Sequence, residues 1–175
     1  MKVICISGKA QHGKDTTAQM IKDVLEDEEH VVLIAHYGDL VKYVCKTFFG
    51  WNGVKDEYGR TLLQEVGTDI VRTKKPGYWV DFIIGILELF PDEWEYVLIP
   101  DARFPDEVEK MKDKFETHCL RIERPNFDNG LTDVQKCHPS ETSLDNYHFD
   151  SVIINPGTKE GLKKAVINWA KELNL

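Results

Sequence analysis

A glycine-rich segment near the amino end constrains the fold of this chain more than any other part of the sequence. Residues 8–14 read GKAQHGK, which matches the pattern GxxxxGK, and they follow an apolar run at residues 3–6 that predicts a buried strand. In this pattern backbone N–H groups surround phosphate oxygens, and the next helix directs its positive end at the same anion. Gly8 and Gly13 allow the close approach that a Cβ would block. We therefore predict a strand, a phosphate-binding loop with Lys14 facing the phosphates, and a helix.

The residue after the lysine departs from the usual pattern. A serine or threonine normally stands there and binds Mg²⁺ through its hydroxyl, whereas this chain has Asp15 followed by Thr16. Asp15 could hold the metal through a water molecule, or Thr16 could take part of that role. The alternative is that Asp15 is only an acid at a helix N-terminus, where it favours the helix dipole.

A second acidic position follows another apolar run. The residues VLIP lead into Asp101, and an apolar strand that ends in a carboxylate is typical of the element that reaches the Mg²⁺ of a bound nucleotide. Arg103 follows two residues later and is expected near the same cleft, where a guanidinium can grip a phosphate through two hydrogen bonds. The alternative for Arg103 is a surface ion pair with Glu107.

A local group of basic residues is present in a chain that is acidic overall. Four surround one predicted helix and its following turn, and two more lie at the end of the fourth predicted strand: Arg60, Arg72, Lys74, Lys75, Arg121 and Arg124. A single arginine is usually a solvated surface group, but together these residues offer what a second anionic substrate needs. The six histidines show no HxxxH or HExxH spacing, so we expect no protein-bound zinc.

Short apolar runs alternate with segments of helical spacing. Buried strands are predicted at residues 3–6, 31–35, 95–100, 117–123 and 151–154. Helices are predicted over residues 13–29, 39–50, 60–73, 78–90, 106–114 and 158–173, with residues 51–59 as a loop. This alternation is typical of an α/β fold with a parallel sheet covered on both faces. Residues 124–149 have little periodicity, and such a long excursion is usually a functional lid or a disordered segment.

Caps and apolar spacing give the details of two helices. Asp39 is the predicted N-cap of the helix over residues 39–50, which runs through Leu40, Val44 and Phe48 and stops at Gly50. The last helix is amphipathic, and its predicted inner face consists of Leu162, Val166, Trp169 and Leu173.

Composition limits the class of protein. The 175 residues fit one domain, or one domain with a small lid. The net charge of −8, from 22 basic and 30 acidic residues, makes the chain a poor candidate for nucleic-acid binding. No stretch approaches the ~20 apolar residues that cross a bilayer, and the amino end lacks the apolar core of a signal peptide. The four scattered cysteines indicate reduced thiols in a cytoplasmic protein, in the host cytoplasm if the chain is viral.

With these residues in place, the chain resembles the deoxynucleoside monophosphate kinases of bacteriophages, relatives of the adenylate kinase-like P-loop kinases. Four segments carry the resemblance, in the order that the family shows: GKAQHGKDT at 8–16, DLVK at 39–42, DARFPDE at 101–107 and HPSE at 138–141. The segment RTLLQEVGTDIVRTKKPGYW at 60–79 looks like that family's substrate region. GKDT is similar to the family's own loop variant. Ala102 and Asp106 stand where the family usually has Val and Asn, and DLVK lacks its common proline.

The resemblance implies a three-layer P-loop fold with a five-stranded parallel sheet. It implies one domain over residues 1–175, with substrate-binding helices over about 39–90 and a lid over about 124–149. It also implies transfer of the ATP γ-phosphoryl group to the α-phosphate of a deoxynucleoside monophosphate, with Mg²⁺. The lid would exclude water, because an open site would lose ATP to hydrolysis.

The resemblance and the motifs together give a set of candidate site residues. The cofactor-binding candidates are Gly8, His12, Gly13, Lys14, Asp15, Thr16, Asn155 and Gly157, and His12 is more incidental than catalytic. The catalytic candidates are Lys14, Arg103 and Arg124, and the metal candidates are Asp15, Thr16 and Asp101. The substrate-binding candidates are Asp39, Lys42, Arg60, Arg72, Trp79, Arg103, His138 and Glu141.

Some of these residues have more specific expected roles. Arg72, Arg103 and Arg124 are expected to hold the acceptor phosphate and the developing negative charge. Asp39 and Trp79 are expected to face the acceptor nucleoside, with Trp79 stacking on it. Adenine of ATP is expected to lie against the loop at residues 155–158, as in similar kinases.

Two alternatives remain open. One is another small-molecule P-loop kinase, such as a dephospho-coenzyme A or phosphomevalonate kinase, and the other is an ATP-binding module with no acceptor. A GTPase is disfavoured because the chain has no NKxD motif, and the protein-kinase signatures HRD and DFG are also missing. The preferred base and the oligomeric state are not determined by the sequence, and a homodimer is one arrangement that it allows.

Overall fold

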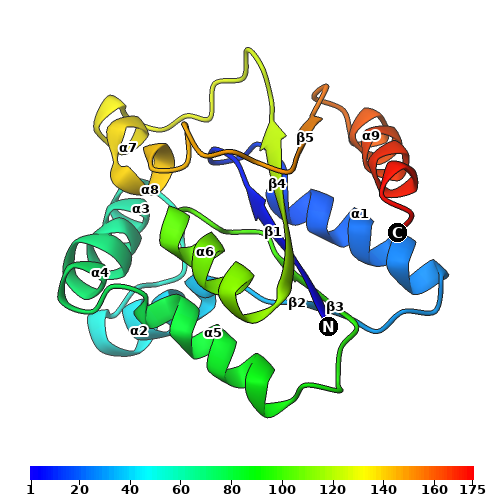
Figure 1. The fold of residues 1–175 in the computed structure, drawn as a ribbon. Coiled ribbons are helices and arrows are strands. Elements are labelled where there is room, and N and C mark those ends of the chain that lie inside the picture. The colour runs from blue at the N-terminus through cyan, green and yellow to red at the C-terminus, as the bar shows by residue number, and fades with distance from the viewer.

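The computed structural model describes all 175 residues and contains one five-stranded sheet (Figure 1). The strands are β1 (Lys2–Ser7), β2 (Val32–Ile34), β3 (Tyr96–Ile99), β4 (Glu116–Glu123) and β5 (Ser151–Ile154). They are ordered β2-β3-β1-β4-β5, and every neighbouring pair is parallel. The five-stranded parallel sheet predicted from the sequence is therefore confirmed.

Helices cover both faces of the sheet and make three layers (Figure 1). One face is covered by α1 (Lys14–Asp27) and α9 (Lys159–Glu172), whose apolar residues share a core with the sheet. The other face is covered by α2 (Tyr37–Phe49), α5 (Tyr78–Leu89) and α6 (Pro105–Lys114). The α/β architecture is thus the predicted one.

The central strand contributes to both cores. On β1, Val3 and Cys5 belong to the core under α2, α5 and α6. Ile4 and Ile6 point to the opposite face, into the core under α1 and α9. Burial on both faces is the physical reason why this strand is a continuous apolar run rather than an alternating one.

The parallel arrangement brings the carboxyl ends of the strands to one edge of the sheet, where ligands bind in folds of this kind. β1 lies between β3 and β4, with Cys5 opposite Ile99 and Ser7 opposite Arg121. The loop after β1 therefore lies beside two other segments, the one that carries Asp101 and the one that follows β4.

The predicted start of α2 is wrong, whereas its predicted stop at Gly50 is confirmed. The helix begins at Tyr37, with His36 as N-cap, so Asp39 lies inside its first turn. Its buried residues are Tyr37, Val41 and Cys45, whereas Phe48 is 70% exposed. The cause is distant in sequence, because the Asp101 carboxylate accepts the backbone N–H groups of Tyr37 and Gly38 and so caps the helix.

The predicted helix over residues 60–73 consists of three consecutive pieces. α3 (Glu57–Gln64) begins within the predicted loop, because Asp56 caps it by accepting the N–H of Gly59. A π-helix, η1 (Glu65–Ile70), and the short α4 (Val71–Lys74) follow. π-helical turns are rare and frequently lie at functional sites.

One prediction near the carboxyl end also needs correction. The excursion over residues 124–149 contains two short helices, α7 (Asp133–Cys137) and α8 (Pro139–Thr142). α9 ends at Glu172, and Leu173 is 38% exposed rather than on the inner face. None of the helices combines the length and apolar character that crossing a bilayer requires.

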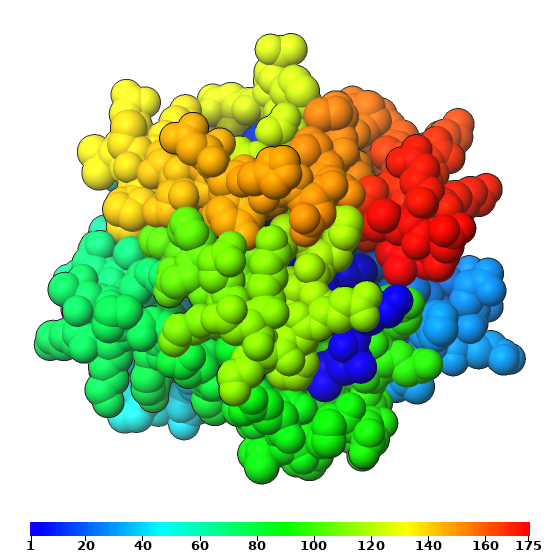
Figure 2. Space-filling view, in the orientation of Figure 1, coloured from blue at the N-terminus to red at the C-terminus, as the bar shows by residue number.

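Residues 124–149 pack against the phosphate-binding loop. The Lys9 ammonium donates to the Glu141 carbonyl and to the Asp145 carboxylate, both at 2.6 Å. In the space-filling view these yellow-to-orange residues lie along one end of the molecule (Figure 2). The excursion therefore forms one wall of the region where the strands end.

Candidate active site

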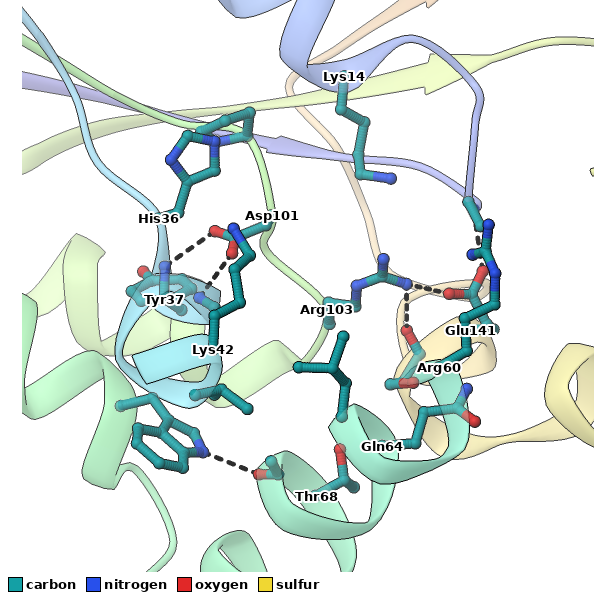
Figure 3. Close-up of a pocket in the computed structure, with 18 of the residues that line it drawn as sticks. Lys14, His36, Tyr37, Lys42, Arg60, Gln64, Thr68, Asp101, Arg103 and Glu141 are labelled. Carbon is teal, nitrogen blue, oxygen red and sulfur yellow. Dashed lines mark hydrogen bonds and ion pairs between the residues drawn. The ribbon is translucent and has the colours of Figure 1, made fainter. Parts of the chain in front are cut away.

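A cavity of about 380 Å³ lies at the carboxyl ends of β1 and β3. Its walls come from the phosphate-binding loop, the start of α2, the α3–η1 segment and α8 (Figure 3). The predicted site residues among its lining are Lys14, Asp15, Lys42, Arg60, Trp79, Asp101, Arg103 and Glu141. Segments far apart in the sequence thus converge on one space.

The two glycines of the loop are required by close contacts. Gly8 has φ 146°, and a Cβ there would lie 2.4 Å from the carbonyl oxygen of Ile122. Gly13 has φ 100°, and a Cβ there would lie 2.8 Å from Nδ2 of Asn155. That amide donates to the His12 carbonyl at 2.9 Å. His12 and Asn155 therefore shape the loop from outside the cavity.

Lys14 extends from the loop into the cavity (Figure 3). Its ammonium donates to the carbonyls of Gly8 at 2.8 Å and Lys9 at 2.9 Å. Burial, together with the nearby Arg103 guanidinium, lowers the pKa of Lys14 to about 7. A nearly buried ammonium at the start of a helix is well placed to gain from a bound anion.

Two carboxylates face the same cavity as Lys14. The oxygens of Asp101 accept the N–H groups of Tyr37 at 3.0 Å and Gly38 at 2.8 Å, and burial raises the pKa of Asp101. Asp15 bonds to Nε2 of His36 at 2.9 Å, and this hydrogen bond lowers the pKa of Asp15. The pKa of His36 is raised by the same bond. Thr16 is exposed and does not line the cavity.

Arg103 is held inside the cavity. Its Nη1 forms an ion pair with Glu141 and donates to the Ser140 carbonyl at 3.0 Å. The alternative of a side-chain ion pair with Glu107 is therefore wrong. Glu107 instead accepts the backbone N–H groups of Arg103 and Phe104, at 2.7 and 3.1 Å, and so fixes the turn that carries the arginine.

Arg72 lies behind the cavity rather than in its lining. Its guanidinium pairs with Asp106 and, at 3.2 Å, with Glu107, and it stacks on the Phe104 ring at 3.8 Å. Burial raises the pKa of Glu107 to about 7, while Arg72 and the two backbone N–H groups oppose this shift. The structure therefore places Arg72 as a support for the Arg103 turn.

Segments other than the loop also bring positive charge to the cavity. Lys55 and Arg60 line the cavity, and neither side chain forms a hydrogen bond or an ion pair within the chain. Lys42, beside them, pairs with Asp39 at 2.6 Å, and Asp39 itself does not line the cavity. The Trp79 indole N–H donates to the carbonyl of Gly67 at 2.8 Å, so this ring is fixed in the wall.

The structure does not bring Arg124 together with Arg72 and Arg103. Its guanidinium stacks on Phe127 at 3.7 Å and donates to the Gly157 carbonyl at 3.4 Å, outside the cavity lining. It therefore lies beside the loop after β5, where adenine is expected. His138 also lies outside the lining, bonded to Asp69 at 3.3 Å.

Sequence reasoning missed several lining residues. Gln64 and Thr68 line the same wall as Arg60, and their spacing of four residues is a helical signal that could have found them. Lys55 lies in a loop and Glu107 in a first helical turn, and neither has a local pattern that distinguishes it from a surface charge.

The fold defines the class of protein. One similar solved structure is a dephospho-CoA kinase from Campylobacter jejuni, with a TM-score of 0.57 and 12% identity over 98% of this chain and 97% of that chain. Another is the Mycobacterium tuberculosis APS kinase in complex with AMPPNP and APS, with a TM-score of 0.54 and 13% identity over 97% of each chain. Shikimate kinase from Aquifex aeolicus is also similar (TM-score 0.52, 13%, 99% and 98%). The chain has the P-loop kinase fold.

The family is defined by sequence. The profile of the deoxynucleotide monophosphate kinase family matches residues 48–166, and the chain belongs to this family. The deoxynucleotide monophosphate kinase of Enterobacteria phage T4 is 30% identical over 125 residues, which cover 70% of this chain and 49% of that protein. The chain thus spans about half the length of this relative.

Proposed function

We propose that the chain is a kinase that transfers the γ-phosphoryl group of ATP to the α-phosphate of a deoxynucleoside 5′-monophosphate. Family membership supports this reaction, and one structural observation carries it: Lys14 lines the cavity together with two cations from other segments, Lys55 and Arg60, whose side chains have no partner within the chain. Phosphoryl transfer asks a protein to position two anions and to neutralise charge, rather than to do covalent chemistry. Three cations from separate segments on one cavity suit that task.

The donor side consists of the loop and its neighbours. The triphosphate would lie along the loop backbone at the positive end of α1, and Lys14 would exchange its two carbonyl partners for phosphate oxygens. Adenine would lie against the loop after β5, where Asn155 and Gly157 are joined by a hydrogen bond. Arg124 and its Phe127 partner border that loop, so we assign Arg124 to the donor side.

The residues present fit a magnesium ion. Asp15 and Asp101 supply carboxylate oxygens on the same cavity as Lys14. Mg²⁺ at nucleotide sites usually takes one or two carboxylates and completes its shell with phosphates and water. When bound, the ion would neutralise charge on the phosphates. Asp101, whose two oxygens are already fixed by backbone N–H groups, would hold it or one of its waters, and exposed Asp15 would supply a second carboxylate.

The acceptor side consists of the α3–η1 wall. Lys55, Arg60 and Lys42 would bind the acceptor phosphate, and Trp79, fixed by Gly67, would contact the nucleoside. The 124–149 segment would exclude water from the reacting groups, because it already contacts the loop through Lys9. The partners in this proposal are small nucleotides, and the proposed location is the cytoplasm.

A coupled assay of ADP release tests the reaction. ATP and magnesium are combined with dGMP, dTMP, dCMP, dAMP, dephospho-coenzyme A and phosphomevalonate as separate acceptors. We expect turnover with at least one deoxynucleotide and none with the last two compounds. Fast turnover only with a non-nucleotide would overturn the proposal, and ATP binding without any acceptor-dependent release would indicate a binding module.

A further inference from the structure

The HPSE segment, residues 138–141, has so far no task beyond excluding water with the rest of residues 124–149. In the structure it lies between the phosphate-binding loop and Arg103 (Figure 3). The side chain of Glu141 is only 5% exposed. Its two carboxylate oxygens contact two different parts of the chain: Oε2 accepts the backbone N–H of Ala10 at 2.9 Å, and Oε1 pairs with Arg103.

Other contacts fix the same segment in place. The Ser140 carbonyl accepts from Nη1 of Arg103 at 3.0 Å, and the Glu141 carbonyl accepts from Lys9 at 2.6 Å. His138 caps α8 and bonds to Asp69 of η1 at 3.3 Å. The segment therefore links the donor loop, the Arg103 turn and the wall of the acceptor side.

The charges explain why a carboxylate is needed at this point. Lys14 and Arg103 carry like charges and line one cavity, and the Glu141 carboxylate that pairs with Arg103 lines it too. A buried carboxylate is costly unless it is paired and hydrogen-bonded, and Glu141 is both. A guanidinium that is already held in place loses less conformational freedom when it meets a phosphate.

We propose that Glu141 is a positioning residue for phosphoryl transfer, which fixes Arg103 beside Lys14 and ties it to the phosphate-binding loop. The inference rests on the proposed kinase function. Glu141 acts through Arg103 and does not itself bind the nucleotide. The same contacts have a rival interpretation, in which the carboxylate is a placeholder that a phosphate of ATP must displace from Ala10 and Arg103.

A double-mutant cycle separates the two interpretations. Glu141→Gln keeps the shape of the side chain but removes the charge, Arg103→Gln removes the guanidinium, and the third variant carries both changes. We expect Glu141→Gln to lower kcat by about 10- to 100-fold and to leave KM for ATP and acceptor within about threefold, because the lost interaction acts in the transition state. In the Arg103→Gln background the second change should have almost no further effect on kcat.

Asp145 provides a matched control. It is another carboxylate of the same segment, and it pairs with Lys9 and Arg121 but not with Arg103. Any effect of Asp145→Asn on kcat should therefore be independent of Arg103. In the double variant, the effects of Asp145→Asn and Arg103→Gln on kcat should add. Glu141→Asp should recover part of the lost kcat, which a purely structural role in a folded protein would not require.

Three results would overturn the inference. Tighter ATP binding by Glu141→Gln would support the placeholder interpretation instead. Additive effects of Glu141→Gln and Arg103→Gln on kcat would exclude action through the arginine. An unchanged kcat in Glu141→Gln would exclude any role of this residue in phosphoryl transfer. If the wild-type protein shows no turnover with any acceptor, the proposed function fails, and ¹⁵N NMR of the Arg103 guanidinium decides the positioning. If the Arg103 guanidinium is as mobile in the wild-type protein as in Glu141→Gln, the positioning role of Glu141 is contradicted.

Discussion

The donor loop and the acceptor wall are built in different ways. The loop is a continuous segment whose backbone is proposed to bind the triphosphate, and its two glycines and Lys14 are fixed by position in the motif. The proposed acceptor wall collects Lys42 from α2, Lys55 from a loop and Arg60 from α3, which only the tertiary structure brings to one cavity. The comparison indicates that the proposed donor site is locally encoded, whereas the proposed acceptor site depends on tertiary structure.

The largest expected effect tests the locally encoded side. Lys14→Ala should lower turnover by about 100-fold or more and leave the fold intact, because it removes charge stabilisation in the transition state. Steady-state kinetics with circular dichroism on the same sample measure both. Lys163→Ala is the control, because this exposed lysine on α9 lies outside the cavity. Near-normal turnover by folded Lys14→Ala would contradict the role of the loop.

The next effect tests the acceptor wall. Lys55→Ala and Arg60→Ala should each raise KM for the acceptor by about tenfold, since each removes one charged contact to the phosphate. KM for ATP should change little in both variants. Lys164→Ala serves as the control, because Lys164 is exposed and lies on α9, at the other face of the sheet. A matching rise in KM for ATP would mean that the two sides are not separate.

The third prediction concerns pH on the donor side. With a pKa of about 7 in the free protein, Lys14 is largely neutral at pH 8 and charged at pH 6. Bound phosphate favours the charged form, so ATP binding at pH 8 should take up a proton, and affinity should fall as pH rises above about 7. Calorimetry in buffers of different ionisation enthalpy measures the uptake. Lys14→Met should abolish it, and equal uptake in that variant would assign the proton elsewhere.

The smallest effect tests the buried face of α2, which supports the acceptor wall. Val41 is buried and Phe48 is 70% exposed. Val41→Ala should cost about 1–2 kcal/mol of unfolding free energy, and Phe48→Ala should change it by less than about 0.5 kcal/mol. Urea unfolding of both variants gives the difference. A larger loss for Phe48→Ala than for Val41→Ala would contradict the observed packing of α2.

The difference between locally encoded and tertiary features also explains which parts of the structure could be predicted from the sequence. The β1–loop–α1 unit and the position of Asp101 could be predicted, because apolar runs and the glycine motif are local signals. The start of α2 could not, since its cap is Asp101, more than sixty residues away. Arg124 was predicted at the acceptor phosphate, but its hydrogen bond to the Gly157 carbonyl places it beside the loop after β5. Such tertiary contacts leave no pattern in the sequence.

The most direct test follows the label from ATP that carries ³²P in its γ-phosphate. With a deoxynucleoside monophosphate and magnesium, we expect the label to appear in the deoxynucleoside diphosphate, in amounts equal to the ADP formed. Label found only in inorganic phosphate would mean that water, and no docked acceptor, receives the group. That outcome would contradict a cavity that holds two anions face to face.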